Sequence, residues 1–374
     1  MLPVRVPPGP TIDPRTGAIT FRVDAMPGVV PERVWFHLRD FGADPTFRPD
    51  GDQWVARIPA PPVDRLEYLI DVRRADGGRE LVCDPGNPVR VPGVFGDKSE
   101  LTLPGYRRPA WLDTPVAGVG AAPGEVVAGV DLLGAWALSS DFEFEAPGVP
   151  GVKVAGLLVT PPDSTRHEPL PLLLAHDGPE YARLAGLLHY LAAVRAESPA
   201  LRCRVALLQP VDRDRSYSAS PGYAREIATR LLPGIRSDFA TRGSVVGIGA
   251  SLGGLAMLHV AVTHPGSVDL VFSQSGSFFR RDTDHMESRF RYFDRIADFV
   301  ATVPGQRVRA AGVRLVMTCG TGEENLDNNR LLSRSLERAG VGCTLTENPD
   351  GHSYTGWRDC LDPTLRALLE HAWG

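Results

Sequence analysis

The stretch Gly249-Ala250-Ser251-Leu252-Gly253-Gly254 (residues 249–254) decides the fold, because it contains the pattern G-x-S-x-G. The apolar run at 245–248 precedes it, and apolar residues suited to a helix continue from Leu255 to Val260. A strand that turns sharply through a serine into a helix is the setting of a nucleophile elbow. Small neighbours allow such a tight turn and let the strand and helix approach closely. Ser251 is therefore our candidate nucleophile.

The sequence around this turn alternates between short apolar runs and helical patterns. Strands are predicted over 154–159, 172–175, 205–208, 244–248, 270–273, 315–319 and 343–347. Helical spacing predicts one helix from Tyr181 to Leu191 and another over 325–339, which Gly340 ends. This alternation favours an α/β-hydrolase domain with a doubly wound, mostly parallel sheet over residues 123–374.

The first hundred residues follow a different pattern, with apolar side chains at every second position. This period of two is typical of strands, and it recurs at 19–25, 34–38, 54–58 and 66–72 with turn residues between. We therefore predict an N-terminal β-sandwich domain over 1–105, of the early-set or immunoglobulin-like type. A linker rich in Pro and Gly is predicted over 106–122.

A serine hydroxyl needs a base, and in a domain of this class the base follows the last strand. His352 fits, because it lies in the turn-rich segment 348–353, between the last predicted strand and the terminal helix. Four other histidines have stronger structural explanations, because two lie in or at the end of the elbow helix, one in the β domain and one near the terminus. They are His259, His264, His37 and His371.

The base in turn needs a carboxylate to hold its tautomer. Chain order predicts this acid between the serine and the histidine, and Glu323 follows the predicted strand at 315–319. Glu324 and Asp327 remain alternatives, since carboxylates here could equally complement the dipole of the helix that follows.

Two backbone N–H groups are expected to bind the oxyanion formed by attack on a carbonyl. One is that of Leu252, and the other is expected in the loop after an early strand. In that loop Pro179 cannot donate, which leaves Gly178 or Glu180, and we favour Gly178. Asp177 is a candidate substrate contact, but an ordinary N-cap is an equally good interpretation.

Composition excludes several other classes of protein. The 374 residues carry a net charge of -5 and no basic tract, which argues against a nucleic-acid or membrane-surface partner. Five widely spaced cysteines without a C-x-x-C pattern argue against a disulfide framework or a zinc site. The N-terminus has no apolar export signal, so we expect a cytoplasmic location. The uncharged stretch at 243–262 suits a buried strand and helix better than a membrane span.

Ordered motifs along nearly the whole chain resemble the enterochelin (enterobactin) esterase family of the esterase-D-like α/β-hydrolases. They comprise, in the first domain, Trp54, 66–68, 84–88 and 95–105, and in the second, 176–178, 212–215, 231–233, 249–254, 273–277, 320–321 and 351–352. The resemblance implies Ser251 as nucleophile, His352 as base and Glu323 as acid, with Arg215 near the substrate. Ser353 departs from the family, in which Asp is common after the catalytic histidine.

The resemblance also implies a small-molecule substrate, a catecholate siderophore built on a serine trilactone, whose ferric complex is an anion. Any iron would then belong to the substrate, and no metal or organic cofactor is implied. Four arginines after the predicted strand at 270–273 could attract an anion, but interleaved acidic residues favour a solvated mixed-charge segment. These arginines are Arg280, Arg281, Arg289 and Arg291.

The sequence therefore predicts a serine esterase that forms an acyl-enzyme, most simply one acting on a siderophore such as enterobactin. A feruloyl or acetyl carbohydrate esterase or an acyltransferase would use the same residues. In that case the N-terminal sandwich could bind glycans through exposed aromatics, but Trp35 and Trp54 are expected in its core. A non-catalytic binding protein of the same fold is the third alternative.

Overall fold

The computed structural model describes residues 8–115, 136–145, 153–305, 308 and 312–374. These residues form two compact units. The first comprises Met1–Arg108 together with Gly320–Glu324 and Pro349–Gly356, and the second comprises Pro109–Cys319, Asn325–Asn348 and Trp357–Gly374. The predicted domain limits at 105 and 123 stay a prediction, and residues 116–122 of the predicted linker lie outside the described residues.

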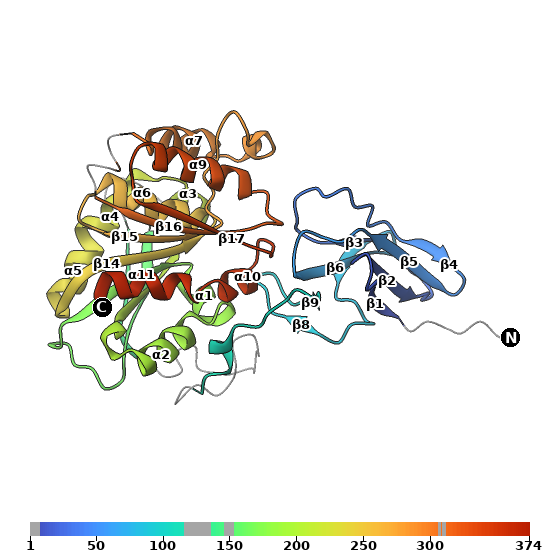
Figure 1. The fold of residues 1–374 in the computed structure, drawn as a ribbon, viewed down its shortest axis with the longest axis horizontal. Helices are drawn as coiled ribbons and strands as arrows, with labels where there is room; N and C mark the ends of the chain where they lie inside the picture. Colours follow the sequence, from blue (N-terminus) through green and yellow to red (C-terminus); the bar gives the residue numbers. More distant parts are fainter. Residues whose placement is uncertain (1–7, 116–135, 146–152, 306–307, 309–311) are drawn as a thin grey trace. The chain divides into compact units, whose positions relative to one another are not determined.

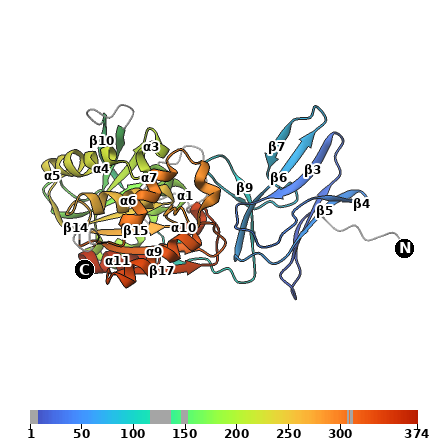
Figure 2. The same ribbon diagram turned by 90° about the horizontal axis from the view of Figure 1, so that it is seen from above.

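The N-terminal unit is built from two β-sheets, with strand orders β1-β2-β5-β4 and β3-β6-β9-β8, and β7 pairs with β6. Figure 2 shows β3, β6 and β7 in one sheet and β4 and β5 in the other. The strands are β1 (Gly9–Ile12), β2 (Ile19–Asp24), β3 (Val29–Trp35), β4 (Arg48–Asp50), β5 (Gln53–Ile58), β6 (Arg65–Arg74), β7 (Arg79–Val82), β8 (Arg90–Val91) and β9 (Lys98–Thr102).

Alternation of buried and exposed residues explains this arrangement. In β2, Ile19, Phe21 and Val23 are buried, and their side chains join those of β6 in one core cluster. The rings of Phe21 and Tyr68, one from each sheet, meet edge to face at 5.0 Å between centroids. The period of two thus identified β2, β5 and β6, while β3 begins and ends earlier than predicted and leaves Leu38 outside the strand. The immunoglobulin-like assignment remains a prediction.

The two tryptophans expected in this core are only half-buried. Trp54 packs against the core cluster, but Trp35 is not among the side chains of the cluster or those packed against it. The prediction of a core position was therefore wrong for Trp35, whose place at the end of β3 leaves part of its ring in solvent.

The second unit is an α/β domain around an eight-stranded sheet of order β10-β11-β13-β12-β14-β15-β16-β17. Its strands are β10 (Ala137–Glu145), β11 (Lys153–Thr160), β12 (Leu170–His176), β13 (Arg204–Pro210), β14 (Thr241–Ala250), β15 (Leu270–Gln274), β16 (Arg314–Gly320) and β17 (Cys343–Asn348). The helices between them are α1 (Gly178–Leu184), α2 (Leu187–Glu197), α3 (Arg213–Tyr217), α4 (Pro221–Glu226), α5 (Leu232–Asp238), α6 (Leu252–Thr263), α7 (Phe293–Thr302), α9 (Leu326–Arg338), α10 (Tyr354–Asp359) and α11 (Thr364–Trp373).

Shorter helical turns complete the second unit. They are η1 (Ala110–Asp113), η2 (Pro199–Leu201), the π-helical η3 (Ile227–Leu231) and η4 (His285–Arg289).

This sheet is mixed, with both antiparallel and parallel pairs. The pairs β10 with β11 and β11 with β13 are antiparallel, whereas β12, β13, β14, β15 and β16 pair in parallel. Sequence analysis did not predict β10, because its apolar residues alternate with polar ones and do not form a buried run. β14 and β15 lie between α6 on one face of the sheet and α11 on the other (Figure 1 and Figure 2).

The helix predicted from Tyr181 to Leu191 is in fact two helices. α1 ends at Leu184 and α2 begins at Leu187, because Gly186 takes a left-handed conformation with φ 61°. The apolar pattern still marks buried residues on both helices. By contrast, the segment at 243–262 is the buried strand and helix that the sequence indicated, β14 and α6. No helix among the described residues is long and apolar enough to cross a membrane.

Candidate active site

Ser251 occupies the turn between β14 and α6, with φ 55° and ψ −125°. Left-handed φ values are costly for a residue with a side chain, so the surrounding structure must impose this conformation. A side chain at Gly249 would place its Cβ 2.4 Å from the carbonyl carbon of Gly253, and one at Gly254 would lie 2.3 Å from Ser273 Oγ. Gly249 and Gly254 are thus required by the close approach of α6 to β14 and β15.

A second serine lies beside the candidate nucleophile. Ser277 Oγ is 3.1 Å from Ser251 Oγ, and the Ser277 N–H donates to the carbonyl oxygen of Ser251 at 3.1 Å. Ser277 is buried, while Ser251 is partly exposed. Ser277 ends the motif at 273–277, but nothing in the local sequence pattern indicates a contact across 26 positions, so the sequence does not predict this contact.

The two expected oxyanion donors are the first residues of helices. Leu252 begins α6 and Gly178 begins α1, directly after β14 and β12. The first N–H groups of a helix have no partner within the helix and carry the positive end of its dipole. Gly178 must be a glycine, since a Cβ there would lie 2.3 Å from the Cα of Leu207 on β13.

Asp177 precedes α1 with φ 49° and is buried. It holds the N-cap position, but its side chain makes no capping hydrogen bond. Instead its carboxylate accepts hydrogen bonds from the Arg213 guanidinium, with Nη2 at 2.7 Å and Nε at 2.9 Å. Its backbone N–H donates to the Tyr217 hydroxyl at 3.1 Å. The Asp177 side chain therefore forms an ion pair with Arg213 and does not cap α1, which was one of the two interpretations of the sequence.

His176 lies beneath the start of α6, with Nδ1 2.9 Å from the carbonyl oxygen of Gly253. Its ring packs on Tyr217 at 4.4 Å between centroids. Complete burial lowers the pKa of His176 to about 4, so this imidazole is neutral at physiological pH. Burial likewise lowers the pKa of His259, in α6, to about 3. Both are structural histidines of the second unit.

The candidate base and acid contact one another in the first unit. His352 Nδ1 lies 2.7 Å from Glu323 Oε2, and the other oxygen of that carboxylate accepts the Gly320 N–H at 2.8 Å. Glu323 is only 2% exposed. With Nδ1 donating to the carboxylate, Nε2 is the atom of His352 that can accept a proton. The His37 ring lies edge-on to His352 at 5.7 Å.

The two alternative acids have different surroundings. Glu324 and Asp327 are both exposed, and Asp327 forms an ion pair with Arg330 one turn along α9 at 3.5 Å. Of the three carboxylates considered, Glu323 is the one in the hydrogen bond to His352.

The parallel strands connect these groups through the chain. Ala250 pairs with Gln274 on β15, and Gln274 pairs with Thr318 on β16. Strands β14 and β16 are therefore two positions apart in one sheet, a separation of about 10 Å, and the elbow follows the carboxyl end of β14. In open α/β sheets this edge is where ligands bind.

Three of the arginines considered for substrate binding form hydrogen bonds or ion pairs with other residues of the second unit. Arg215 lies in α3, where its N–H donates to Asp212 at 3.0 Å and its carbonyl accepts from Arg295 Nη2 at 2.7 Å. Arg280 pairs with Asp282 at 3.2 Å. Arg281 pairs with Asp294 and Asp298 at 3.0 and 2.9 Å. These pairs support the mixed-charge interpretation of that segment over an open anion site.

The described residues hold no group of three or more His, Cys, Asp or Glu side chains placed to bind a metal ion. The second unit presents a strained serine and helix N-termini, and the first unit contains a buried histidine–carboxylate pair. These groups are those of acyl transfer to a serine.

A family model described as "Putative esterase" matches residues 150–368, more than half of the chain. The chain belongs to this esterase family. It is a carboxylic ester hydrolase, and the matched region contains Ser251, Glu323 and His352. No curated protein matches the sequence.

Solved structures of esterases share the fold. An enterochelin esterase from Shigella flexneri is 19% identical, with 97% of this chain and 95% of that chain covered and a TM-score of 0.69. A ferric enterobactin esterase from Salmonella typhimurium is 19% identical, with 97% and 98% covered and a TM-score of 0.68. A ferulic acid esterase is 18% identical, with 64% and 99% covered and a TM-score of 0.52. The enterochelin and enterobactin esterases thus share the fold of both units of this chain.

Proposed function

We propose that this esterase acts through Ser251, His352 and Glu323. His352 Nε2 takes the proton of the Ser251 hydroxyl as Oγ attacks the ester carbonyl carbon. The negative charge that develops on the carbonyl oxygen is held by the N–H groups of Leu252 and Gly178. The intermediate collapses to an acyl-enzyme when His352 returns the proton to the leaving alcohol, and water activated by His352 then releases the acid.

The observation that carries this proposal is the hydrogen bond between His352 Nδ1 and Glu323 at 2.7 Å. A buried carboxylate on Nδ1 favours the tautomer in which Nε2 can accept a proton, and it stabilises the imidazolium that forms during attack. The backbone of Ser251 supports the assignment independently, because a φ of 55° at a residue with a side chain is the strained turn of a nucleophile elbow.

For the substrate we propose a catecholate siderophore of the enterobactin type. Two observations support this choice. Structures of enterochelin and enterobactin esterases match both units, and one of them was determined in the presence of enterobactin. The ferulic acid esterase matches only 64% of the chain. In this proposal Arg215 contacts the anionic substrate, and Asp177 does so as part of its ion pair with Arg213.

The mechanism is tested by Ser251→Ala on a p-nitrophenyl ester. Turnover should fall to background while circular dichroism and the melting temperature stay those of the parent. Unchanged turnover in the folded variant would exclude the proposed nucleophile.

The substrate class needs a separate comparison. The parent enzyme is assayed on ferric enterobactin, a feruloyl ester and a short acyl ester, and kcat/KM is measured for each. We expect the catecholate trilactone to be preferred by at least about 100-fold, the discrimination that a site built on polar contacts can provide. A preference for the feruloyl ester would replace the siderophore with a carbohydrate ester and leave the mechanism intact.

A further inference from the structure

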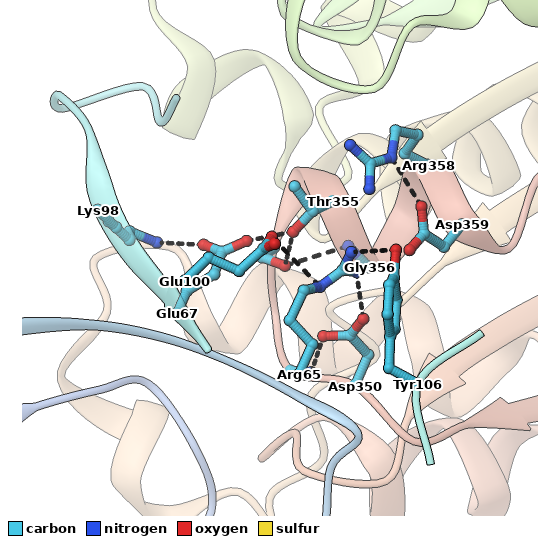
Figure 3. Close-up of polar contacts among 12 residues, drawn as sticks. Arg65, Glu67, Lys98, Glu100, Tyr106, Asp350, Thr355, Gly356, Arg358 and Asp359 are labelled. Atoms are coloured by element: carbon cyan, nitrogen blue, oxygen red, sulfur yellow. Dashed lines mark hydrogen bonds and ion pairs between the residues drawn. The ribbon is translucent and has the colours of Figure 1, made fainter. Parts of the chain in front are cut away.

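Arg65 is a charged side chain buried at the start of β6, with no exposed side-chain surface. Its Nη2 contacts the Asp350 carboxylate and its Nη1 donates to the Tyr106 hydroxyl at 3.3 Å. Glu100 Oε2 lies 4.0 Å from its Nε. Figure 3 shows the guanidinium between these groups. Because 285 positions separate Arg65 from Asp350, the contact joins the N-terminal β-sheet to the segment that carries His352.

Asp350 links both segments of the histidine–carboxylate pair. Its Oδ1 accepts the Gly351 N–H at 2.8 Å, directly before His352. Its carbonyl oxygen accepts the Gly322 N–H at 3.1 Å, directly before Glu323. Asp350 is therefore hydrogen-bonded both to the residue before His352 and to the residue before Glu323.

Further contacts from the N-terminal strands hold the same two segments. Glu67 lies on the same face of β6 as Arg65 and accepts hydrogen bonds from Thr355 and, at 3.0 Å, from Lys98 (Figure 3). The Asp64 N–H donates to the Pro349 carbonyl at 2.7 Å. The histidine segment is thus held near both of its ends by residues at the beginning of β6.

The acid segment is held in the same manner. The Thr321 hydroxyl donates to the Pro62 carbonyl at 2.6 Å, and the Arg39 N–H donates to the Gly322 carbonyl at 2.7 Å. All these contacts lie within the first unit, which is why Gly320–Glu324 and Pro349–Gly356 group with the N-terminal β-sheets.

A buried ion pair is a poor way to gain stability, since well-packed apolar residues do as well or better. Its value lies in fixing a geometry, and a catalytic group displaced by 1 Å costs about 100-fold in rate. We propose that Arg65, through Asp350, is a positioning residue that fixes the His352–Glu323 pair for proton transfer. The inference rests on the proposed function, and it gives the N-terminal β domain a part in catalysis besides any contact with substrate.

The test compares Arg65→Met, Asp350→Asn and Arg65→Lys, with Arg74→Met as control. Arg74 lies at the other end of β6, half-exposed and paired with Glu80. On a p-nitrophenyl ester we expect Arg65→Met and Asp350→Asn to lower kcat by about 10- to 100-fold with KM little changed, because both residues are buried and their proposed effect is on the base. Arg65→Lys should recover part of kcat, and Arg74→Met should match the parent.

A fluorophosphonate probe separates positioning from a loss of folded enzyme. If Arg65 positions the base, Arg65→Met and Asp350→Asn should each label completely but slowly. Partial labelling at the parent rate, or a folded Asp350→Asn variant with the parent's kcat, would overturn the proposal. Should Arg65→Met fail to fold, Asp350→Asn decides, because the amide keeps the shape of the carboxyl group.

The outcome is distinct from that of the proposed function. If Ser251→Ala abolishes turnover while Arg65→Met and Asp350→Asn keep it, only the positioning role is lost. If Ser251→Ala keeps turnover, the proposed mechanism itself fails.

Discussion

The elbow and the histidine–carboxylate pair are fixed by the fold in different ways. Ser251 owes its conformation to neighbours within three positions, because Gly249 and Gly254 permit the contact of strand and helix. The pair of Glu323 and His352 joins residues 29 positions apart, and strand β6 holds it from 285 positions away. The conformation of the proposed nucleophile is therefore encoded locally, whereas the geometry of the proposed base and acid depends on tertiary contacts.

The largest effect is expected at the base. His352→Ala should lower kcat by at least about 10⁴-fold, because the variant lacks the proposed base for the serine proton. Steady-state hydrolysis of a p-nitrophenyl ester measures this. His371→Ala, at an exposed position in α11, is the matched control and should keep the parent rate. Similar rates for the two variants would mean that the locally encoded serine works without the distant histidine.

The acid is expected to matter less than the base. Glu323→Gln keeps the shape of the side chain but no longer stabilises the imidazolium, and kcat should fall by about 10²- to 10⁴-fold. Glu324→Gln and Asp327→Asn should stay within about twofold of the parent, because both side chains are exposed. Activity that is lost in Glu324→Gln and kept in Glu323→Gln would move the acid to the neighbouring residue.

The local packing of the elbow is tested by the free energy of unfolding. Gly249→Ala forces a Cβ to within 2.4 Å of backbone atoms of Gly253, so unfolding should become easier by about 1–3 kcal/mol. Gly234→Ala in α5 meets nothing within 4 Å and should be stabilising by about 0.5–1 kcal/mol. Urea unfolding of both variants measures the difference. Equal midpoints would show that the elbow has more room than its geometry indicates.

A smaller effect is expected from the serine beside the nucleophile. Ser277→Ala removes one hydrogen bond of 3.1 Å to Ser251 Oγ, worth about 1 kcal/mol, so kcat/KM should change by about fivefold. The direction separates two roles for Ser277. A slower enzyme means that Ser277 orients the nucleophile, and a faster one means that it competes with His352 for the hydroxyl proton. A change in kcat/KM beyond about 100-fold would make Ser277 a catalytic residue and would contradict the small effect expected of it.

The sequence predicts the local features of the site better than the contacts between distant residues. The strand, turn and helix around Ser251 could be predicted because spacing and glycines record them directly. Chain order predicted His352 and Glu323 as the base and the acid. Their hydrogen bond could not be predicted, because the two residues are distant in the sequence. The same holds for the contacts of Ser277, Arg65 and Asp350. Gly186 could have indicated the break between α1 and α2, since glycine is the residue that most readily takes a left-handed conformation.

The central claim is that Ser251 is activated by His352. Labelling with a fluorophosphonate, followed by mass spectrometry of the peptides, tests it most directly. We predict a single modified residue, Ser251, in the parent enzyme, and labelling slowed by at least about 10³-fold in His352→Ala. Modification of another residue, or an undiminished rate in His352→Ala, would contradict the account.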